Sequence, residues 1–142
     1  MATVRTAQTT WEGSLTEGAG KVSLDSSGIG TYEVSWASRT EEANGKTSPE
    51  ELIAAAHSSC NSMALSGALA KADTPPQYLH TKADVTFQPG EGITGIHLTV
   101  VGTVEGISEE DFVAAAEGAK QNCPVSQALA AVKNITLDAS LA

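Results

Sequence analysis

The chain contains only two cysteines, Cys60 and Cys123, and both lie where a thiol could be chemically useful. Cys60 is inside an alanine-rich helical run, and Cys123 directly precedes Pro124 at the predicted start of another helix. Two thiols that are far apart in sequence can form a transient disulfide once folding brings them together, so the pair suggests a redox couple. Two buried, unreactive cysteines are the alternative interpretation.

A reactive Cys60 needs a cation nearby, because the thiolate is the nucleophile and a thiol with a pKa of about 8.5 is mostly protonated at neutral pH. The apolar helix face around Cys60 works against the thiolate. Arg39 stands out among the eight basic residues, because it leaves a predicted strand just before the helix of Cys60. A guanidinium also stays charged when it is partly desolvated. Glu50 is the natural carboxylate to orient this arginine through a bidentate pair.

Glu50 and Cys60 cannot meet within one chain if both lie on the same helix. The ten residues from one to the other correspond to about 15 Å of rise along the helix axis. If Arg39 and Glu50 serve Cys60, we therefore expect them to come from a second subunit. The functional unit would then be a dimer.

Cys123 and His57 each allow more than one role. Cys123 occupies an N-cap-like position before Pro124, where unpaired amide groups and the helix dipole favour an anion, which suits a resolving thiol or a leaving thiolate. His57 lies three residues before Cys60, and this spacing could indicate a Cys-His hydrolase or transferase. We favour a packing or hydrogen-bonding role for His57.

The pattern of the chain predicts an α+β fold in the order βββαββααβ. Glycine-rich turns separate three short strands in the first third, which we expect to form an antiparallel meander. A long central helix, two long alternating strands, two helices and a last strand follow. The predicted strands cover residues 4–11, 21–24, 31–36, 79–87, 93–105 and 134–138, and the predicted helices cover residues 49–71, 109–120 and 124–132.

Capping sequences predict where the two longer helices begin. Ser48 precedes Pro49 and is followed by Glu51 three residues later, and Ser108 precedes a second capping box. The central helix carries an apolar stripe spaced alternately three and four residues apart, which predicts a buried face that includes Cys60. The stripe consists of Ile53, Ala56, Cys60, Met63, Gly67 and Ala70.

Composition limits the classes of function. A chain of 142 residues is expected to be one domain, residues 1–142, and its net charge of -9 argues against a nucleic-acid partner. The start of the chain lacks the apolar core of a signal peptide, and no run of about 18 apolar residues could span a bilayer, so we expect a cytoplasmic protein that does not contact a membrane. Cys-x-x-Cys is absent, which excludes a thioredoxin-like motif, and no Cys and His cluster has zinc-site spacing, so we expect no metal.

Three segments of the chain carry a family resemblance. They are Trp11-Glu12-Gly13, Ser48-Pro49-Glu50-Glu51-Leu52 running into Ala54-Ala55-Ala56-His57-Ser58-Ser59-Cys60, and Cys123-Pro124-Val125-Ser126-Gln127. Taken together they resemble the OsmC/Ohr family over nearly the whole chain, because each cysteine lies in its family context and the two are at the family's separation. The stretch around Cys60 and the presence of Arg39 are more similar to the osmotically inducible branch than to the organic hydroperoxide resistance branch.

The resemblance implies an intertwined homodimer in which antiparallel sheets wrap around central helices. It also implies a cysteine-dependent peroxidase that reduces organic hydroperoxides, and hydrogen peroxide less efficiently, in oxidative and osmotic stress defence. By position, Cys60 is the peroxidatic thiol that forms a sulfenic acid, Cys123 the resolving thiol, Arg39 the thiolate-stabilising cation and Glu50 its carboxylate partner. A dithiol, lipoylated proteins among them, recycles such enzymes without metal or flavin.

Two residues depart from the family pattern. Ser48 stands where relatives often have Asn, which preserves the capping chemistry. Asn61 follows Cys60 where an aromatic residue is frequent, which affects the pocket.

The alternative function is a non-enzymatic redox sensor or a hydrophobic-ligand-binding protein of the same fold. Turnover separates the two, because a sensor is oxidised once per equivalent of peroxide whereas an enzyme cycles.

Overall fold

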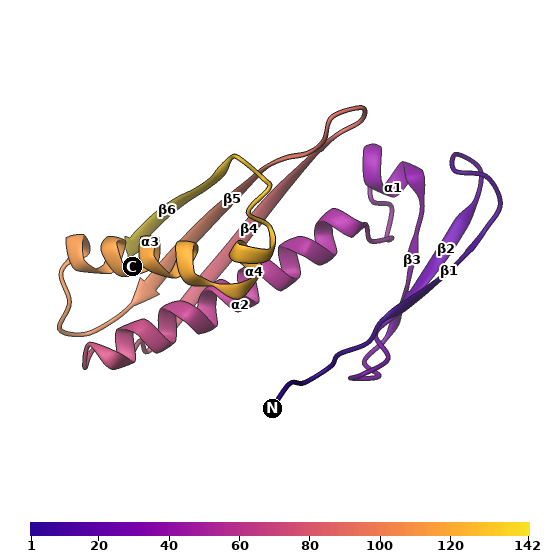
Figure 1. Ribbon diagram of the computed structural model, residues 1–142. Helices are drawn as coiled ribbons and strands as arrows, with labels where there is room; N and C mark the ends of the chain where they lie inside the picture. The colour runs from indigo at the N-terminus through magenta and orange to yellow at the C-terminus, as the bar shows by residue number, and fades with distance from the viewer. The chain divides into compact units, whose positions relative to one another are not determined.

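The computed structural model describes residues 1–142 and contains helices and strands in an α+β arrangement (Figure 1). The chain forms two compact units, Met1–Leu52 and Ile53–Ala142, and each is described by itself. None of the helices combines the length and the apolar character that crossing a membrane requires.

The first unit contains a three-stranded sheet in which neighbouring strands are antiparallel and follow the order of the chain. This confirms the predicted meander, although the first strand begins later than expected. The strands are β1 (Gln8–Glu12), β2 (Ala19–Ser23) and β3 (Thr31–Val34).

A short helix, α1 (Trp36–Thr40), follows the first sheet and was not predicted. Ser35 and Ser38 form a reciprocal capping box, in which each side chain accepts a hydrogen bond from the backbone N–H of the other. The sequence rule expects Glu or Gln at the third helical position, so a serine there gave no signal. The order of elements is therefore βββααββααβ, and Arg39 lies on a helix rather than at a strand end.

The long helix α2 (Pro49–Lys71) has the predicted bounds, and most of it belongs to the second unit. The Ser48 side chain accepts a hydrogen bond from the amide of Glu51, as expected of an N-cap. The Glu51 carboxylate accepts a hydrogen bond from the hydroxyl of Thr47. The start of the helix is thus held by side chains on both sides of Pro49.

The second unit has a sheet in the order β4-β5-β6, in which β4 and β5 are antiparallel but β5 and β6 are parallel. The parallel pair departs from the antiparallel sheets that were expected. Two helices connect β5 to β6, which gives the chain the crossover length that a parallel pair needs. These elements are β4 (Tyr78–Gln88), β5 (Gly92–Thr103), α3 (Glu109–Asn122), α4 (Pro124–Ala128) and β6 (Ile135–Leu141).

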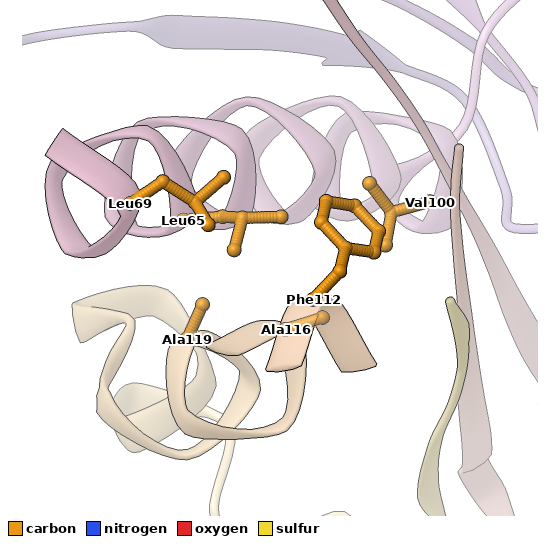
Figure 2. Close-up of a cluster of buried hydrophobic side chains, with 6 residues drawn as sticks. All are labelled: Leu65, Leu69, Val100, Phe112, Ala116 and Ala119. Carbon is orange, nitrogen blue, oxygen red and sulfur yellow. The ribbon is translucent and has the colours of Figure 1, made fainter. Parts of the chain in front are cut away.

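The core of the second unit lies between α2, α3 and the sheet (Figure 2). All six side chains of this cluster are almost completely shielded from solvent, so their apolar area contributes stability through removal from water. They are Leu65 and Leu69 of α2, Val100 of β5, and Phe112, Ala116 and Ala119 of α3.

The buried stripe of α2 differs from the one predicted. His57, Asn61, Leu65 and Leu69 are fully buried and follow one another at a spacing of four residues, whereas Met63 of the predicted stripe is 73% exposed. Because His57 and Asn61 are polar, the apolar periodicity of the sequence did not indicate that this face of α2 is the buried one. Small apolar residues on the other face supplied a competing pattern.

We predict that Gly102→Ala destabilises the second unit. An added Cβ would lie 2.6 and 2.7 Å from the ring carbons of Phe112, which is packed in the core and cannot move aside. The free energy of unfolding should fall by about 1–3 kcal/mol, measured by denaturant titration. Gly118→Ala on α3 is the control, since its Cβ would meet nothing within 4 Å. It should raise the same free energy by about 0.5–1 kcal/mol.

Candidate active site

Arg39 and Glu50 form a bidentate ion pair in the first unit. Arg39 lies in the last turn of α1 and Glu50 in the first turn of α2. Arg39 Nε donates to both Glu50 carboxylate oxygens at 3.0 Å, and Arg39 Nη2 donates to Oε2 at 2.9 Å. The guanidinium carbon also lies 5.8 Å from the centre of the Trp36 ring, within the range of a cation–π contact. The cation is thereby held in one orientation.

An apolar pocket of about 380 Å³ adjoins Arg39 within the first unit. Its walls include the rings of Trp11 and Trp36 and the side chains of Leu15 and Leu52. An apolar pocket with one fixed cation suits a small molecule that has a hydrocarbon part and a polar end.

Cys60 and Cys123 are brought together in the second unit. Cys60 lies on α2, and Cys123 joins α3 to α4, so the contact depends on how these elements pack. The two thiols lie close enough that each changes the pKa of the other. Cys60 is half-buried, whereas Cys123 is completely buried, and both are free thiols. The arrangement allows the two sulfurs to form a disulfide when an oxidant removes two electrons.

The pKa of Cys60 is raised within the chain. Burial is the largest cause, because it disfavours the charged form. The neighbouring Cys123 thiol raises the pKa further, and the amide of Val125 opposes this effect. Cys60 is therefore the protonated partner of the thiol pair unless a cation approaches it.

The pKa of Cys123 is lowered, although burial alone would raise it. The Cys123 side chain forms no regular capping hydrogen bond to α4. The donors near its sulfur lower the pKa, and these are the Cys60 thiol, the amides of Ser126 and Val125, and the Ser126 hydroxyl. Together these donors outweigh the burial and favour the Cys123 thiolate.

His57 and Ser126 are buried polar residues next to the thiol pair. His57 Nε2 lies 2.6 Å from Ser126 Oγ, and burial lowers the pKa of His57. Ser126 is part of the motif that follows Cys123, but the sequence did not indicate its role. Its contact with His57 joins residues 69 positions apart, which no local pattern reveals. The hydrogen bond of His57 agrees with the hydrogen-bonding role that we favoured over that of a base.

The two predicted pairs belong to different units of the chain, with Arg39 and Glu50 in the first and both thiols in the second. Helix α2 carries Glu50 and Cys60 ten residues apart, which corresponds to about 15 Å of rise. No group of three or more His, Cys, Asp and Glu side chains is arranged to hold a metal ion.

Comparison with known sequences gives consistent matches. A family model described as OsmC-like protein matches residues 41–138. Peroxiredoxin OsmC of Escherichia coli K12 is 42% identical over 137 residues, which cover 94% of each chain, and the protein of the same name from Shigella flexneri matches equally well.

Solved structures share the fold over almost the whole chain. An organic hydroperoxide resistance protein from Elizabethkingia anophelis is 26% identical, with a TM-score of 0.69 and coverage of 100% of this chain and 99% of that one. An OsmC-like protein from Mycoplasma pneumoniae is 13% identical, with a TM-score of 0.74 and coverage of 99% of each. The predicted OsmC-like fold class is confirmed.

Proposed function

This chain belongs to the OsmC-like protein family, and from that premise we propose that it is a thiol-dependent peroxidase that reduces organic hydroperoxides. The observation that carries the proposal is the contact between a half-buried Cys60 thiol and a buried Cys123 thiol of lowered pKa. A pair of this kind can be oxidised to a disulfide and reduced again. The 42% identical relative carries the name peroxiredoxin.

The proposed reaction has two steps at sulfur. The Cys60 thiolate attacks the distal peroxide oxygen, the O–O bond breaks, and the alkoxide leaves as an alcohol after taking a proton, so that Cys60 becomes a sulfenic acid. The Cys123 thiolate then attacks the Cys60 sulfur, the S–O bond breaks, and hydroxide leaves as water after taking a proton. A dithiol reduces the resulting disulfide by exchange and is itself oxidised to a disulfide.

Access and acidity point to different thiols as the attacker, and we assign the role by access. Cys123 has the lower pKa, but its side chain is completely buried, so a peroxide cannot reach it without a movement of α4. Cys60 is partly exposed. Reactive cysteines lie in partly exposed, electropositive surroundings, so Cys60 needs a cation to complete its site.

We assign that cation to Arg39 of a second subunit in a homodimer. The ion pair with Glu50 orients the guanidinium, and the neighbouring apolar pocket would hold the hydrocarbon part of the hydroperoxide. The exposed face of α2, with Met63 73% exposed among small residues, supports a helix contact between two copies. In this proposal residues 1–142 act as one domain of the dimer.

The reductant in this proposal is a dithiol, and lipoylated proteins are one class that supplies it. We also place the protein in the cytoplasm, where dithiol systems are kept reduced. Removal of hydroperoxides supports a role in oxidative stress defence, and the resemblance to the osmotically inducible branch supports a role in osmotic stress.

The test is turnover of cumene hydroperoxide by the full chain in the presence of dihydrolipoamide. We expect each protein molecule to consume many equivalents of hydroperoxide, measured as loss of peroxide over time. Hydrogen peroxide should be consumed more slowly, because it has no hydrocarbon part to occupy the apolar pocket.

A redox sensor is the second candidate, favoured by the burial of Cys123. A sensor would consume one equivalent and stop, even with fresh dithiol present in excess. Consumption that ends after one equivalent with both lipoyl and simple dithiols would overturn the peroxidase proposal.

A further inference from the structure

A buried histidine reaches the thiol pair through one hydroxyl group. His57 is fully buried on α2, and its Nε2 lies 2.6 Å from Oγ of Ser126, which is 6% exposed. The Ser126 hydroxyl in turn lies near the sulfur of Cys123 and helps to lower the pKa of that thiol. Three buried side chains from α2, α4 and the junction before α4 thus form a continuous line of contacts.

The direction of each hydrogen bond follows from the proposed resolving step, in which Cys123 reacts as a thiolate. A thiolate only accepts, so the Ser126 hydroxyl donates its hydrogen to Cys123. The oxygen of Ser126 then accepts from His57, which places the ring hydrogen on Nε2. Burial lowers the pKa of His57 and keeps the ring neutral, so Nδ1 is left as an acceptor.

We infer that His57 is a positioning residue for the resolving thiol, because its hydrogen bond holds the Ser126 hydroxyl in place beside the buried sulfur of Cys123. The meaning of this role rests on the proposed peroxidase function. In the resolving step, Cys123 supplies the electron pair of the new S–S bond, the S–O bond of the Cys60 sulfenic acid breaks, and the departing hydroxide takes a proton from solvent. His57 and Ser126 transfer no proton in this step.

Asn61 is the partner that we assign to the second ring nitrogen of His57. The only buried side-chain polar atoms without a partner in the whole chain are His57 Nδ1 and the two amide atoms of Asn61. Asn61 follows His57 by one helical turn on the same buried face, where Cβ atoms are about 5–6 Å apart. Rotation of the amide would direct its N–H toward Nδ1, which would give Nδ1 a donor and favour the tautomer with hydrogen on Nε2.

The test measures the titration of Cys123 directly, by the ultraviolet absorbance of the thiolate in Cys60→Ser protein. Serine at position 60 keeps a hydroxyl donor and removes the second titrating thiol. Besides Cys60, the titratable group in the line of contacts is His57, which is neutral. We expect Ser126→Ala to lower the thiolate fraction at neutral pH by about tenfold, because a hydrogen bond to a charged group is lost.

Variants of His57 distinguish a role in positioning Ser126 from a role in packing the core. We expect His57→Phe to lower the thiolate fraction by about threefold, because Ser126 loses the donor that orients it. His57→Gln keeps an N–H donor near the place of Nε2 and should restore the fraction. Asn61→Leu should shift the titration in the same direction as His57→Phe. Ser62→Ala is the matched control on α2, since its hydroxyl bonds Ser58 and Thr81 instead.

A merely structural role would lower the melting temperature without moving the titration of Cys123. Folded Ser126→Ala or His57→Phe protein that titrates like the parent would overturn the inference, as would a shift that His57→Gln fails to restore. If His57→Phe does not fold, Ser126→Ala decides alone. Absence of peroxide turnover in the wild type would end the peroxidase proposal but leave this titration result intact, so the two failures are distinguishable.

Discussion

Cys60→Ser is expected to abolish the turnover of organic hydroperoxide, with kcat/KM falling by more than about 10³-fold. Serine has no thiolate to attack the peroxide oxygen and cannot form a sulfenic acid. Cys123→Ser should keep the first oxidation, because Cys60 is the thiol that solvent reaches. Repeated turnover of hydroperoxide by the Cys123→Ser variant should then depend on direct reduction of the Cys60 sulfenic acid by the external thiol.

Intact mass after one equivalent of cumene hydroperoxide checks these expectations. The wild type should lose two hydrogen atoms through the Cys60–Cys123 disulfide, Cys123→Ser should gain one oxygen atom, and Cys60→Ser should keep its mass. An oxygen adduct on Cys123 in the Cys60→Ser variant would instead exchange the two roles. That outcome would mean that acidity, and not access, selects the attacking thiol.

The local sequence predicted most elements of the fold because their ends carry their own signals. Ser48 and Pro49 mark the start of α2, and the observed helix has the predicted bounds. The short α1 was missed because it has fewer than two turns and a capping box built from two serines. The parallel pairing of β6 with β5 was missed because strand direction is decided by the crossover and not by the strand's own pattern.

The candidate site was partly predictable for a related reason. Residue type and capping context indicated the two cysteines, and helix rise indicated that Glu50 and Cys60 of one chain stay apart. The contact between the thiols depends on the packing of α2 against the α3–α4 junction, which no local pattern encodes. The same is true of the contact between His57 and Ser126. Both residues are polar and buried, whereas sequence patterns predict apolar residues at buried positions.

Arg39→Ala is expected to lower kcat/KM for organic hydroperoxides by about 10²–10³-fold, because the guanidinium stabilises both the attacking thiolate and the charge that develops as the O–O bond breaks. The pKa of Cys60 is raised within its own chain, so removal of the cation leaves less thiolate at neutral pH. Activity of the variant should therefore rise with pH and level off at a higher pH than in the wild type. Arg5→Ala, which removes the same charge from an exposed position, is the matched control.

Mixed dimers test whether Arg39 acts across the subunit interface. A dimer of one Cys60→Ser chain and one Arg39→Ala chain, isolated with two different tags, has one complete site if the arginine serves the partner's cysteine. We expect about half of the wild-type turnover from such dimers, although both parent variants are nearly inactive. If Arg39 served Cys60 of its own chain, both sites of the mixed dimer would be defective and no activity would return. Because Glu50 orients Arg39, pairing Cys60→Ser with Glu50→Gln should give the same complementation from a less impaired parent.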